Sequence, residues 1–178
     1  VQPYKCGPEI TDTQLLTLSA DNEAVNLDEW LTTYTHIQHT YNKYGEKADA
    51  CIIEGNGALF DGYKRMQGSS AEIAKLLKEN NINIAIDTSG FVPRETLDKI
   101  IPYTDTFLFD IKAIDEEVHI NCTGVSNKPI LENIKYIDRL GIPIEIRYPY
   151  IPSMNDSEAE KIAEFVKELK SVKTIRIC

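Results

Sequence analysis

The segment INIAIDTSGFVPRETLDKIIPYTDTFLFDIK, residues 82–112, decides the fold that we expect for this chain. It holds two apolar runs, Ile82–Ile86 and Thr106–Phe109. The first run stops at Asp87 and the second at Asp110. Continuous apolar runs are typical of buried parallel strands, and the residues between them suit a short helix. The segment therefore predicts a βαβ unit whose two aspartates emerge at one edge of a parallel sheet, where ligand sites of such sheets lie.

The composition is that of a globular domain, and it argues against some partners. The 178 residues carry 19 basic and 28 acidic side chains, which gives a net charge of −9 without a basic cluster. We therefore expect neither nucleic acid nor an anionic membrane as a partner. No apolar run approaches the roughly 20 residues that a membrane span needs, and no signal peptide is visible. A cytoplasmic location is the expectation.

The four cysteines, Cys6, Cys51, Cys122 and Cys178, lie far apart in the sequence. Zinc sites and iron–sulfur clusters need thiolates whose spacing lets them converge on one centre. The spacing therefore predicts no iron–sulfur ligands among these residues. A disulfide framework is not expected at this chain length, so the cysteines should be free thiols.

The first part of the chain combines short strands, helices and a glycine-rich turn. A helix is expected over residues 29–44, and its buried stripe would be Trp30, Tyr34, Ile37 and Tyr41. A strand over residues 48–53 leads into Glu54 and the glycine-rich segment 55–62. An acid at a strand end before such a turn suits a magnesium–nucleotide site, because the carboxylate reaches the ion and glycines let the backbone approach phosphate. Plain turn geometry also explains the glycines.

Four motifs in this part follow one another as in cobyrinic acid a,c-diamide synthase: VQPYKCGPEITD (1–12), NLDEW (26–30), IIEGNGALFDG (52–62) and GSSAEIAKLLK (68–78). Residues 1–78 thus resemble that family, which uses ATP and magnesium to activate a corrinoid carboxylate for amidation. The resemblance implies a P-loop-NTPase-like fragment, with Lys5 near phosphate and with Glu54 and Asp61 near the magnesium–nucleotide. The family's phosphate-binding loop, G-x-x-x-x-G-K-[ST], does not occur in this sequence, so most of the phosphate cradle is missing.

The remaining residues repeat a strand–helix rhythm. Strands are expected to begin near residues 82, 106, 143 and 173, with a helix in each gap. Right-handed crossovers would place the C-terminal ends of these strands on one side of the sheet. Four charged residues would then gather at one mouth: Asp87, Asp110, Lys112 and Arg147. Two acids with two bases suit a zwitterionic ligand, and they equally suit a salt-bridge group that ties strand ends together.

Four motifs of this half resemble pyruvate formate-lyase activating enzyme and related glycyl-radical activases: NINIAIDTSGFVPRETLDKI (81–100), TDTFLFDIK (104–112), HINCTGVSNKPILENIKYI (119–137) and IEIRYPYIPSMND (144–156). These radical enzymes use S-adenosylmethionine (SAM) and a 4Fe-4S cluster on a partial β/α barrel. The resemblance implies that SAM would contact Asp87, Thr88, Asp110, Lys112, His119 and Arg147. It also implies a glycyl-radical enzyme as partner, and a monovalent-cation site made by Asp87, Thr88, the Leu108 carbonyl and Asp110.

Two departures from the activase pattern matter. The C-x-x-x-C-x-x-C motif that holds the family's cluster does not occur in this sequence, so the cluster ligands are absent here. Ser153 stands where the family has a glycine after Ile-Pro, a departure expected to change only a turn. We therefore expect an activase-like fragment that is catalytically incomplete.

The two resemblances meet within residues 76–80, on a helix that both families place before a buried strand. The expected architecture is a chimera of two α/β fragments, residues 1–78 and 79–178, built from serial βα units with mainly parallel strands and with one continuous sheet as an option. Three functions stay open: a radical SAM activase relative, an ATP-dependent amide ligase that uses ATP and magnesium, and a non-catalytic α/β module. An incomplete sheet would expose strand edges, so self-association is also expected.

Overall fold

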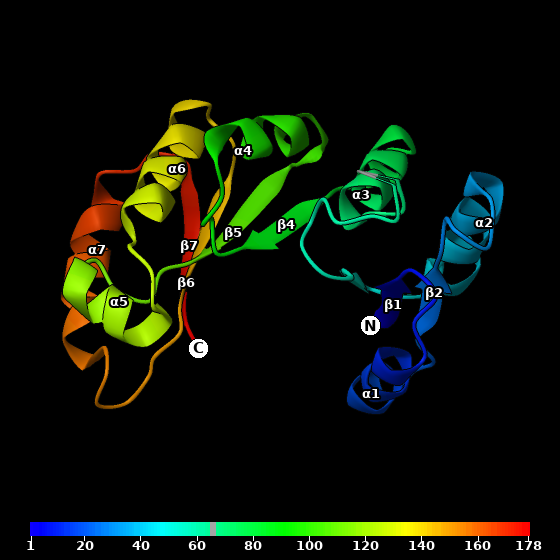
Figure 1. Ribbon diagram of the computed structural model, residues 1–178, viewed down its shortest axis with the longest axis horizontal. Coiled ribbons are helices and arrows are strands. Elements are labelled where there is room, and N and C mark those ends of the chain that lie inside the picture. The colour runs from blue at the N-terminus through cyan, green and yellow to red at the C-terminus, as the bar shows by residue number, and fades with distance from the viewer. Residues whose placement is uncertain (65–66) are drawn as a thin grey trace. The chain divides into compact units, whose positions relative to one another are not determined.

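The chain divides into two compact units in the computed structural model, which describes residues 1–64 and 67–178 (Figure 1). The first unit is Val1–Ile82 and the second is Asn83–Cys178. Both consist of parallel strands connected by helices, which confirms the predicted α/β class with parallel sheets. The described strands form one sheet of three strands and one of four. Within the described part of the chain, no helix is long and apolar enough to cross a membrane.

The first unit is built around β1, Gln2–Cys6, which pairs in parallel with one strand on either side. All five residues of β1 are buried, as expected for the central strand of the order β2-β1-β3. The other elements of this unit are α1 (Thr11–Ala20), β2 (Val25–Leu27), α2 (Tyr34–Gly45), β3 (Cys51–Glu54) and α3 (Ser70–Glu79). Ser69 caps α3, because its hydroxyl accepts the backbone N–H of Glu72.

The helix predicted over residues 29–44 begins later than expected. Helix α2 starts at Tyr34, because the hydroxyl of Thr33 accepts a backbone N–H of the first turn and caps the helix there. The residues just before the predicted start pair with β1 as strand β2. The buried stripe is therefore shorter than predicted. Ile37 is 1% exposed, but Trp30 lies outside the helix and is 64% exposed.

The second unit carries four parallel strands in the order β4-β5-β6-β7. Each strand follows its neighbour in the sequence, so their C-terminal ends lie at one edge of the sheet. The elements are β4 (Ala85–Thr88), α4 (Arg94–Ile100), β5 (Thr106–Asp110), α5 (Glu116–Thr123), α6 (Lys128–Arg139), β6 (Ile144–Tyr148), α7 (Ala159–Lys167) and β7 (Val172–Ile177). Two 3-10 helices, Ile101–Tyr103 and Asp156–Glu158, complete the unit.

One face of this four-stranded sheet holds the core of the second unit. Helices α5, α6 and α7 lie on one side of the sheet (Figure 1). The strand residues of the core and the inward residues of α6 are almost fully buried: Phe107, Phe109, Ile144, Ile146, Ile130, Ile134 and Ile137. Burial of each such side chain stabilises the fold by roughly 1.5–3 kcal/mol. Because side chains alternate along a strand, the opposite face carries the intervening residues, which include Asp87, Leu108, Asp110 and Arg147.

The first strand of the second unit differs from its prediction. Strand β4 begins at Ala85 instead of Ile82, and Asp87 lies within the strand instead of after it. Ile84 precedes the strand and donates its N–H to the carboxylate of Asp105 over 2.8 Å. This hydrogen bond holds Ile84 against the turn before β5, so the regular pairing of β4 with β5 starts only at Ala85. The strands predicted near residues 106, 143 and 173 begin within one residue of those positions.

Candidate functional site

Three adjacent strands of the second unit place charged side chains next to one another. The register of β4, β5 and β6 sets Asp87 opposite Leu108, and Asp110 opposite Arg147. By the alternation of side chains, Asp87, Asp110 and Arg147 share the face opposite to the core. The pairing therefore produces the gathering of acids and arginine that the sequence predicted at this sheet edge.

Arg147 connects the two aspartates. Its Nε and Nη2 atoms lie 2.9 and 2.8 Å from Oδ1 of Asp110, and Nη2 also donates to Oδ1 of Asp87. Lys112 joins them, because its Nζ donates to Oδ2 of Asp110 over 2.8 Å. Burial alone would lower the pKa of the Arg147 guanidinium, but Asp110 and Asp87 raise it above its ordinary value. We call these four residues the Arg147 group; it holds two cations and two carboxylates.

Exposure differs within the Arg147 group. The side chains of Asp110, Lys112 and Arg147 are 23, 24 and 27% exposed, whereas that of Asp87 is 55% exposed. An ion pair in contact with solvent contributes only about 0–1 kcal/mol, since water screens it and the side chains lose freedom. The contact of Arg147 with Asp110 is therefore the more firmly held one, and the Asp87 carboxylate is the group most open to exchange with a ligand.

Two further residues predicted for this site make other contacts. Thr88 ends β4, and its hydroxyl accepts the N–H of Gly90 over 3.1 Å. His119 lies in α5 with 2% exposure, and its Nδ1 is 2.9 Å from the carbonyl oxygen of Val125. Thr88 thus lies next to Asp87 in β4 but bonds to the following turn. The ring of His119 is held by the turn that follows α5.

The turn after β4 is held by contacts that sequence reasoning missed. Gly90 has a φ of 74°, and a Cβ atom there would lie 2.9 Å from the ring of Phe109, so this position requires glycine. Asn133 of α6, 3% exposed, donates to the carbonyl oxygens of Gly90 and Val92 over 2.9 and 2.8 Å. A signal was present, because an asparagine on the inward face of a helix needs hydrogen-bond partners. Asn133 shares that face of α6 with Ile130, Ile134 and Ile137.

In the first unit, Lys5 is buried among acidic groups. It is 3% exposed, and its Nζ lies 2.7 Å from Asp12, 3.5 Å from Glu54 and 2.9 Å from the carbonyl oxygen of Gly55. Burial would lower the pKa of the Lys5 ammonium, but Asp12 and Glu54 raise it above its ordinary value. The structure thus brings together two of the three residues predicted for a nucleotide, Lys5 and Glu54, as an ion pair.

Asp61, the third of those residues, lines an open cavity of about 400 Å³ in the first unit. One oxygen of its carboxylate accepts the N–H of Ala58 over 3.0 Å. Trp30 and Tyr63 also line this cavity, and their rings stack with centroids 6.1 Å apart. The rest of the lining includes Gly7, Asp28 and Asn56. The cavity is of a size that suits a small ligand.

The chain's cysteines do not fit an iron–sulfur cluster. Among residues 1–64 and 67–178, no group of three His, Cys, Asp or Glu side chains is placed to hold a metal ion. All four cysteines are free thiols; Cys6 is buried and Cys178 is exposed. A four-iron cluster is held by convergent thiolates, and these thiols offer no such arrangement.

The fold is that of an α/β protein with parallel strands, and it carries charged residues on the sheet face opposite its helices. Comparison with known proteins identifies the family. The family model described as the radical SAM superfamily matches residues 57–166, which is more than half of the 178 residues. The chain belongs to the radical SAM superfamily. The matched range begins before the junction predicted at residues 76–80, so it includes helix α3, which the first resemblance had assigned to the corrinoid family.

Activating enzymes of glycyl-radical enzymes are among the similar proteins. The trans-4-hydroxy-L-proline dehydratase activating enzyme of Clostridioides difficile is 41% identical over 101 residues, covering 54% of this chain and 33% of that protein. The pyruvate formate-lyase 1-activating enzyme of Escherichia coli K12 is 33% identical over 104 residues, covering 56% and 42%. The choline trimethylamine-lyase activating enzyme of Oleidesulfovibrio alaskensis is 31% identical over 126 residues, covering 68% and 41%. The chain thus spans less than half the length of these relatives.

A solved structure shows the same kind of fold. The crystal structure of a domain of pyruvate-formate lyase-activating enzyme from Bacteroides vulgatus has a TM-score of 0.55 and 29% sequence identity. The likeness covers 60% of this chain and 68% of that one. The predicted resemblance to the glycyl-radical activases, and the predicted partial-barrel type of sheet, are confirmed.

Proposed function

We propose that the second unit binds the methionine end of SAM, as part of a protein of the glycyl-radical activase type. The observation that carries the proposal is the Arg147 group, which sets two carboxylates and two cations on adjacent strands within a matched radical SAM segment. The SAM carboxylate would pair with Arg147 or Lys112, and its ammonium with Asp87 or Asp110, because charge-assisted hydrogen bonds are the strong ones. The residues fit this part of SAM by charge and by hydrogen-bond type.

SAM supplies the superfamily's chemistry, which is radical generation by reductive cleavage at a 4Fe-4S cluster. The Arg147 group fits SAM, whereas the cysteines of this chain do not fit the cluster. We therefore propose SAM binding, and not complete catalysis, as the property of these 178 residues. His119 was expected to contact SAM, and that role remains a proposal; its ring would have to leave the contact with Val125 to do so.

Calorimetric titration of the full chain with SAM tests the proposal. Weak binding is expected, in the range of high micromolar to millimolar, because only a few charged contacts are available. Arg147→Gln should weaken it by at least about tenfold, since a hydrogen bond to a charged group contributes roughly 1.5–3 kcal/mol. Arg139→Gln is the matched control, because it removes the same charge from the exposed last turn of α6. No binding at millimolar SAM, or equal losses in both variants, would overturn the proposal.

The Arg147 group is also proposed to take a monovalent cation, through Asp87, Thr88, the Leu108 carbonyl and Asp110. Asp87 and Leu108 are register partners on neighbouring strands, which brings two of these four residues side by side. Both aspartates already contact Arg147, so a cation would gain access when a bound carboxylate draws the guanidinium away. SAM affinity should then be several-fold higher in potassium chloride than in tetramethylammonium chloride at equal ionic strength. Equal affinities in the two salts would exclude the cation site.

The first unit supports a second candidate function, ATP binding with magnesium as in a corrinoid amide ligase. The observation that favours it is the ion pair of buried Lys5 with the exposed Glu54, in a unit whose glycine-rich turn lines a cavity. On this hypothesis the chain is a chimera in which residues 1–78 derive from a P-loop-NTPase-like protein. Magnesium–ATP binding that Glu54→Ala abolishes and Glu46→Ala leaves intact would support it. No binding at millimolar ATP would rule it out.

Thermal unfolding separates both binding hypotheses from a non-catalytic α/β module. A ligand that binds only the native state must raise the melting temperature, by an amount that grows with its concentration. An unchanged melting temperature with millimolar SAM and with millimolar magnesium–ATP would favour the hypothesis of a non-catalytic α/β module.

The partner and the setting of the protein follow from the same proposal. The relatives named above activate glycyl-radical enzymes, so we propose a glycyl-radical enzyme as the partner. Strands β2, β3, β4 and β7 are the edges of the two sheets, which supports self-association through strand pairing. Sedimentation at two protein concentrations tests that point. The free cysteines support a cytoplasmic location, where thiols stay reduced.

A further inference from the structure

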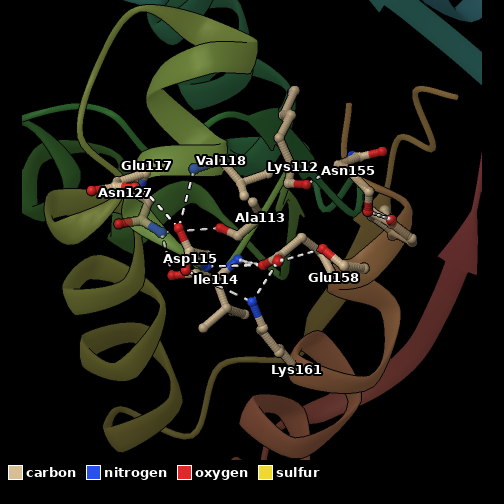
Figure 2. A network of polar contacts seen from close by, with 12 residues as sticks. Lys112, Ala113, Ile114, Asp115, Glu117, Val118, Asn127, Asn155, Glu158 and Lys161 are labelled. Atoms are coloured by element: carbon tan, nitrogen blue, oxygen red, sulfur yellow. Dashed lines mark hydrogen bonds and ion pairs between the residues drawn. The ribbon is translucent and has the colours of Figure 1, made fainter. Parts of the chain in front are cut away.

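The segment between β5 and α5, residues 111–115, follows directly on Asp110 and forms neither helix nor strand. It is nevertheless buried in part: Ile111 is 1% exposed and Ala113 is 0% exposed. A buried irregular segment must find partners for its backbone N–H and C=O groups, because an unpaired one is costly away from water. Figure 2 shows that side chains from other parts of the unit supply these partners.

Glu158 supplies the acceptors. It is 0% exposed, and its Oε2 accepts the N–H groups of Ile114 and Asp115 over 2.8 and 2.9 Å. Its Oε1 lies 2.8 Å from Nζ of Lys161 (Figure 2). Burial would raise the pKa of Glu158, but the backbone N–H groups and Lys161 lower it below its usual range. Glu158 is therefore a buried carboxylate that is ionised and bound by the backbone of this segment.

Asn155 ties the segment to the loop after β6. It is 0% exposed, and its Nδ2 donates to the carbonyl oxygens of Lys112 and Pro149 over 2.8 and 2.9 Å. Its Oδ1 accepts the N–H of Ile151 over 2.7 Å. The two loops that Asn155 joins begin just after the strand ends that carry the central ion pair of the Arg147 group. The Asn155 side chain thus holds together the two loops that follow Asp110 and Arg147.

Asn127 supplies the remaining donors. Asn127 stands at the N-cap position of α6, yet its side chain makes no cap hydrogen bond to that helix. Its Nδ2 instead donates to the carbonyl oxygens of Ala113 and Ile114 over 3.0 and 2.7 Å. Together, Asn127, Asn155 and Glu158 bind five backbone groups within residues 112–115.

We propose that Asn127, Asn155 and Glu158 are positioning residues that hold Lys112 against Asp110. The carbonyl of Lys112 is bound by Asn155, and the backbone that follows is bound at four further groups, so the Cα atom of Lys112 cannot shift freely. Its Nζ then reaches Oδ2 of Asp110 over 2.8 Å. Buried polar networks of this kind cost desolvation that apolar packing avoids, and they fix one geometry in return. The consequence for SAM rests on the proposed function.

The first test needs no SAM. Trace acetic anhydride acetylates lysines of the native full chain, and mass spectrometry gives the rate at each residue. A lysine nitrogen that is held against a carboxylate and is mostly shielded from solvent reacts slowly, because the reagent cannot reach it readily. Asn155→Ser should raise the Lys112 rate about two- to fivefold, the amount expected for release of a partly buried ion pair. Lys167, exposed on α7, is the internal standard whose rate should not change.

Two further variants guard against a general loss of stability. Glu158→Gln keeps the size of the side chain and removes its charge, and it should also raise the Lys112 rate. Ile162→Val, a core change in α7, should leave the Lys112 rate unchanged although it also destabilises the unit. An unchanged Lys112 rate in both Asn155→Ser and Glu158→Gln would overturn the inference, whether or not the chain binds SAM.

The second test asks whether the three positioning residues affect SAM binding through Lys112. Asn155→Ser should weaken SAM binding about two- to fivefold in the parent chain and have little effect in a Lys112→Met background. Equal losses in both backgrounds would show a merely structural role and overturn the inference. A faster Lys112 rate in a chain that binds no SAM would instead support the positioning of Lys112 and overturn the proposed function.

Discussion

The two units share a parallel βα architecture, but they bury their strands to different degrees. In the second unit, β5 and β6 alternate buried with half-buried residues, and helices α5, α6 and α7 lie against the buried side. In the first unit, β1 is buried throughout, whereas β3 alternates half-buried with exposed residues and α1 contains no buried residue. The apolar side chains that the first unit leaves exposed include Ile10, Leu15, Leu18, Leu31 and Ile52.

The units differ in the extent of their cores, because the first unit buries residues of β1 and α3 but none of α1. The radical SAM match, residues 57–166, contains β4, β5 and β6 with the helices between them. The exposed apolar residues of the first unit named above all precede residue 57. Because burial of apolar surface is the dominant favourable contribution to folding, we expect the second unit to be the more stable of the two.

The largest expected effect tests this difference in packing. Phe109→Ala should lower the free energy of unfolding of the second unit by about 3–5 kcal/mol, because the ring is 0% exposed and its removal leaves a cavity. Leu18→Ala in α1, where the side chain is 79% exposed, should change stability by less than about 0.5 kcal/mol. Urea unfolding followed by hydrogen exchange assigns each change to its unit. Equal effects of the two substitutions would contradict the comparison.

The buried carboxylate of the second unit should give the next largest effect. The folded pKa of Glu158 is lowered, so its contribution to stability is fully present above the unfolded pKa of about 4.3 and is lost as pH falls through the folded pKa. Glu158→Gln should therefore cost about 2–3 kcal/mol at neutral pH and nearly nothing in strong acid. Melting curves across this pH range measure the effect, with the exposed Glu160→Gln as control. A constant difference at every pH would show that the charge of Glu158 is unimportant.

The first unit should respond to pH in the opposite direction. The N–H of Gly68 lies 3.2 Å from Oε2 of Glu29 and 2.9 Å from Oε2 of Glu72, so two carboxylates meet at one donor. Burial and the nearby Glu72 raise the pKa of Glu29 to about 8. The folded unit therefore binds the extra proton, and its stability should fall as pH rises from the unfolded pKa of about 4.3 to about 8.

Substitution of that glutamate sharpens the contrast between the units. Glu29→Gln mimics the protonated form, so it should raise stability by about 1–2 kcal/mol at a pH above the folded pKa and leave it unchanged near pH ~4. Glu23→Gln, which changes an exposed glutamate of the same unit, is the control. Melting temperatures of both variants at the two pH values decide the matter. A gain at acidic pH would mean that the two carboxylates do not share a proton.

The smallest expected effect concerns a turn of the second unit. Ser153 has a φ of 65°, in the left-handed region that glycine adopts without strain and other residues do not. Ser153→Gly should therefore stabilise the unit by about 0.5–1 kcal/mol, the relief of strain being partly offset by greater freedom of the unfolded chain. Thermal unfolding measures the gain. A loss of stability would show that the serine side chain makes a contact worth more than the strain.

Local sequence patterns predicted the second unit better than the first. Helix α6, Lys128–Arg139, lies in one of the gaps in which a helix was predicted, and its Ile130, Ile134 and Ile137 are buried. The aspartate that ends β5 and the arginine in β6 were predicted to meet, because parallel strands in series leave few other registers. In the first unit, the tyrosines and tryptophan of residues 30–41 had the same periodicity, yet Trp30 lies outside α2. Pairing of β2 with β1 overrode that pattern.

The contacts around residues 111–115 lay beyond any local pattern. Glu158 binds the N–H of Ile114 across 44 positions, and Asn155 binds the carbonyl of Lys112 across 43. Periodicity and capping rules act over a few residues, so they indicate which side chains are polar but not which distant backbone groups they will meet.

The sequence by itself determined the class of this protein: apolar runs that stop at charged residues require parallel strands in series, and this order brings Asp87, Asp110 and Arg147 to neighbouring strands. Only the tertiary structure decided that the described strands form a sheet of three and a sheet of four, and that Asn155 binds the carbonyl of Lys112. The physical reason is that strand identity depends on local burial patterns, whereas sheet pairing and buried hydrogen bonds depend on which distant groups meet once the chain is folded.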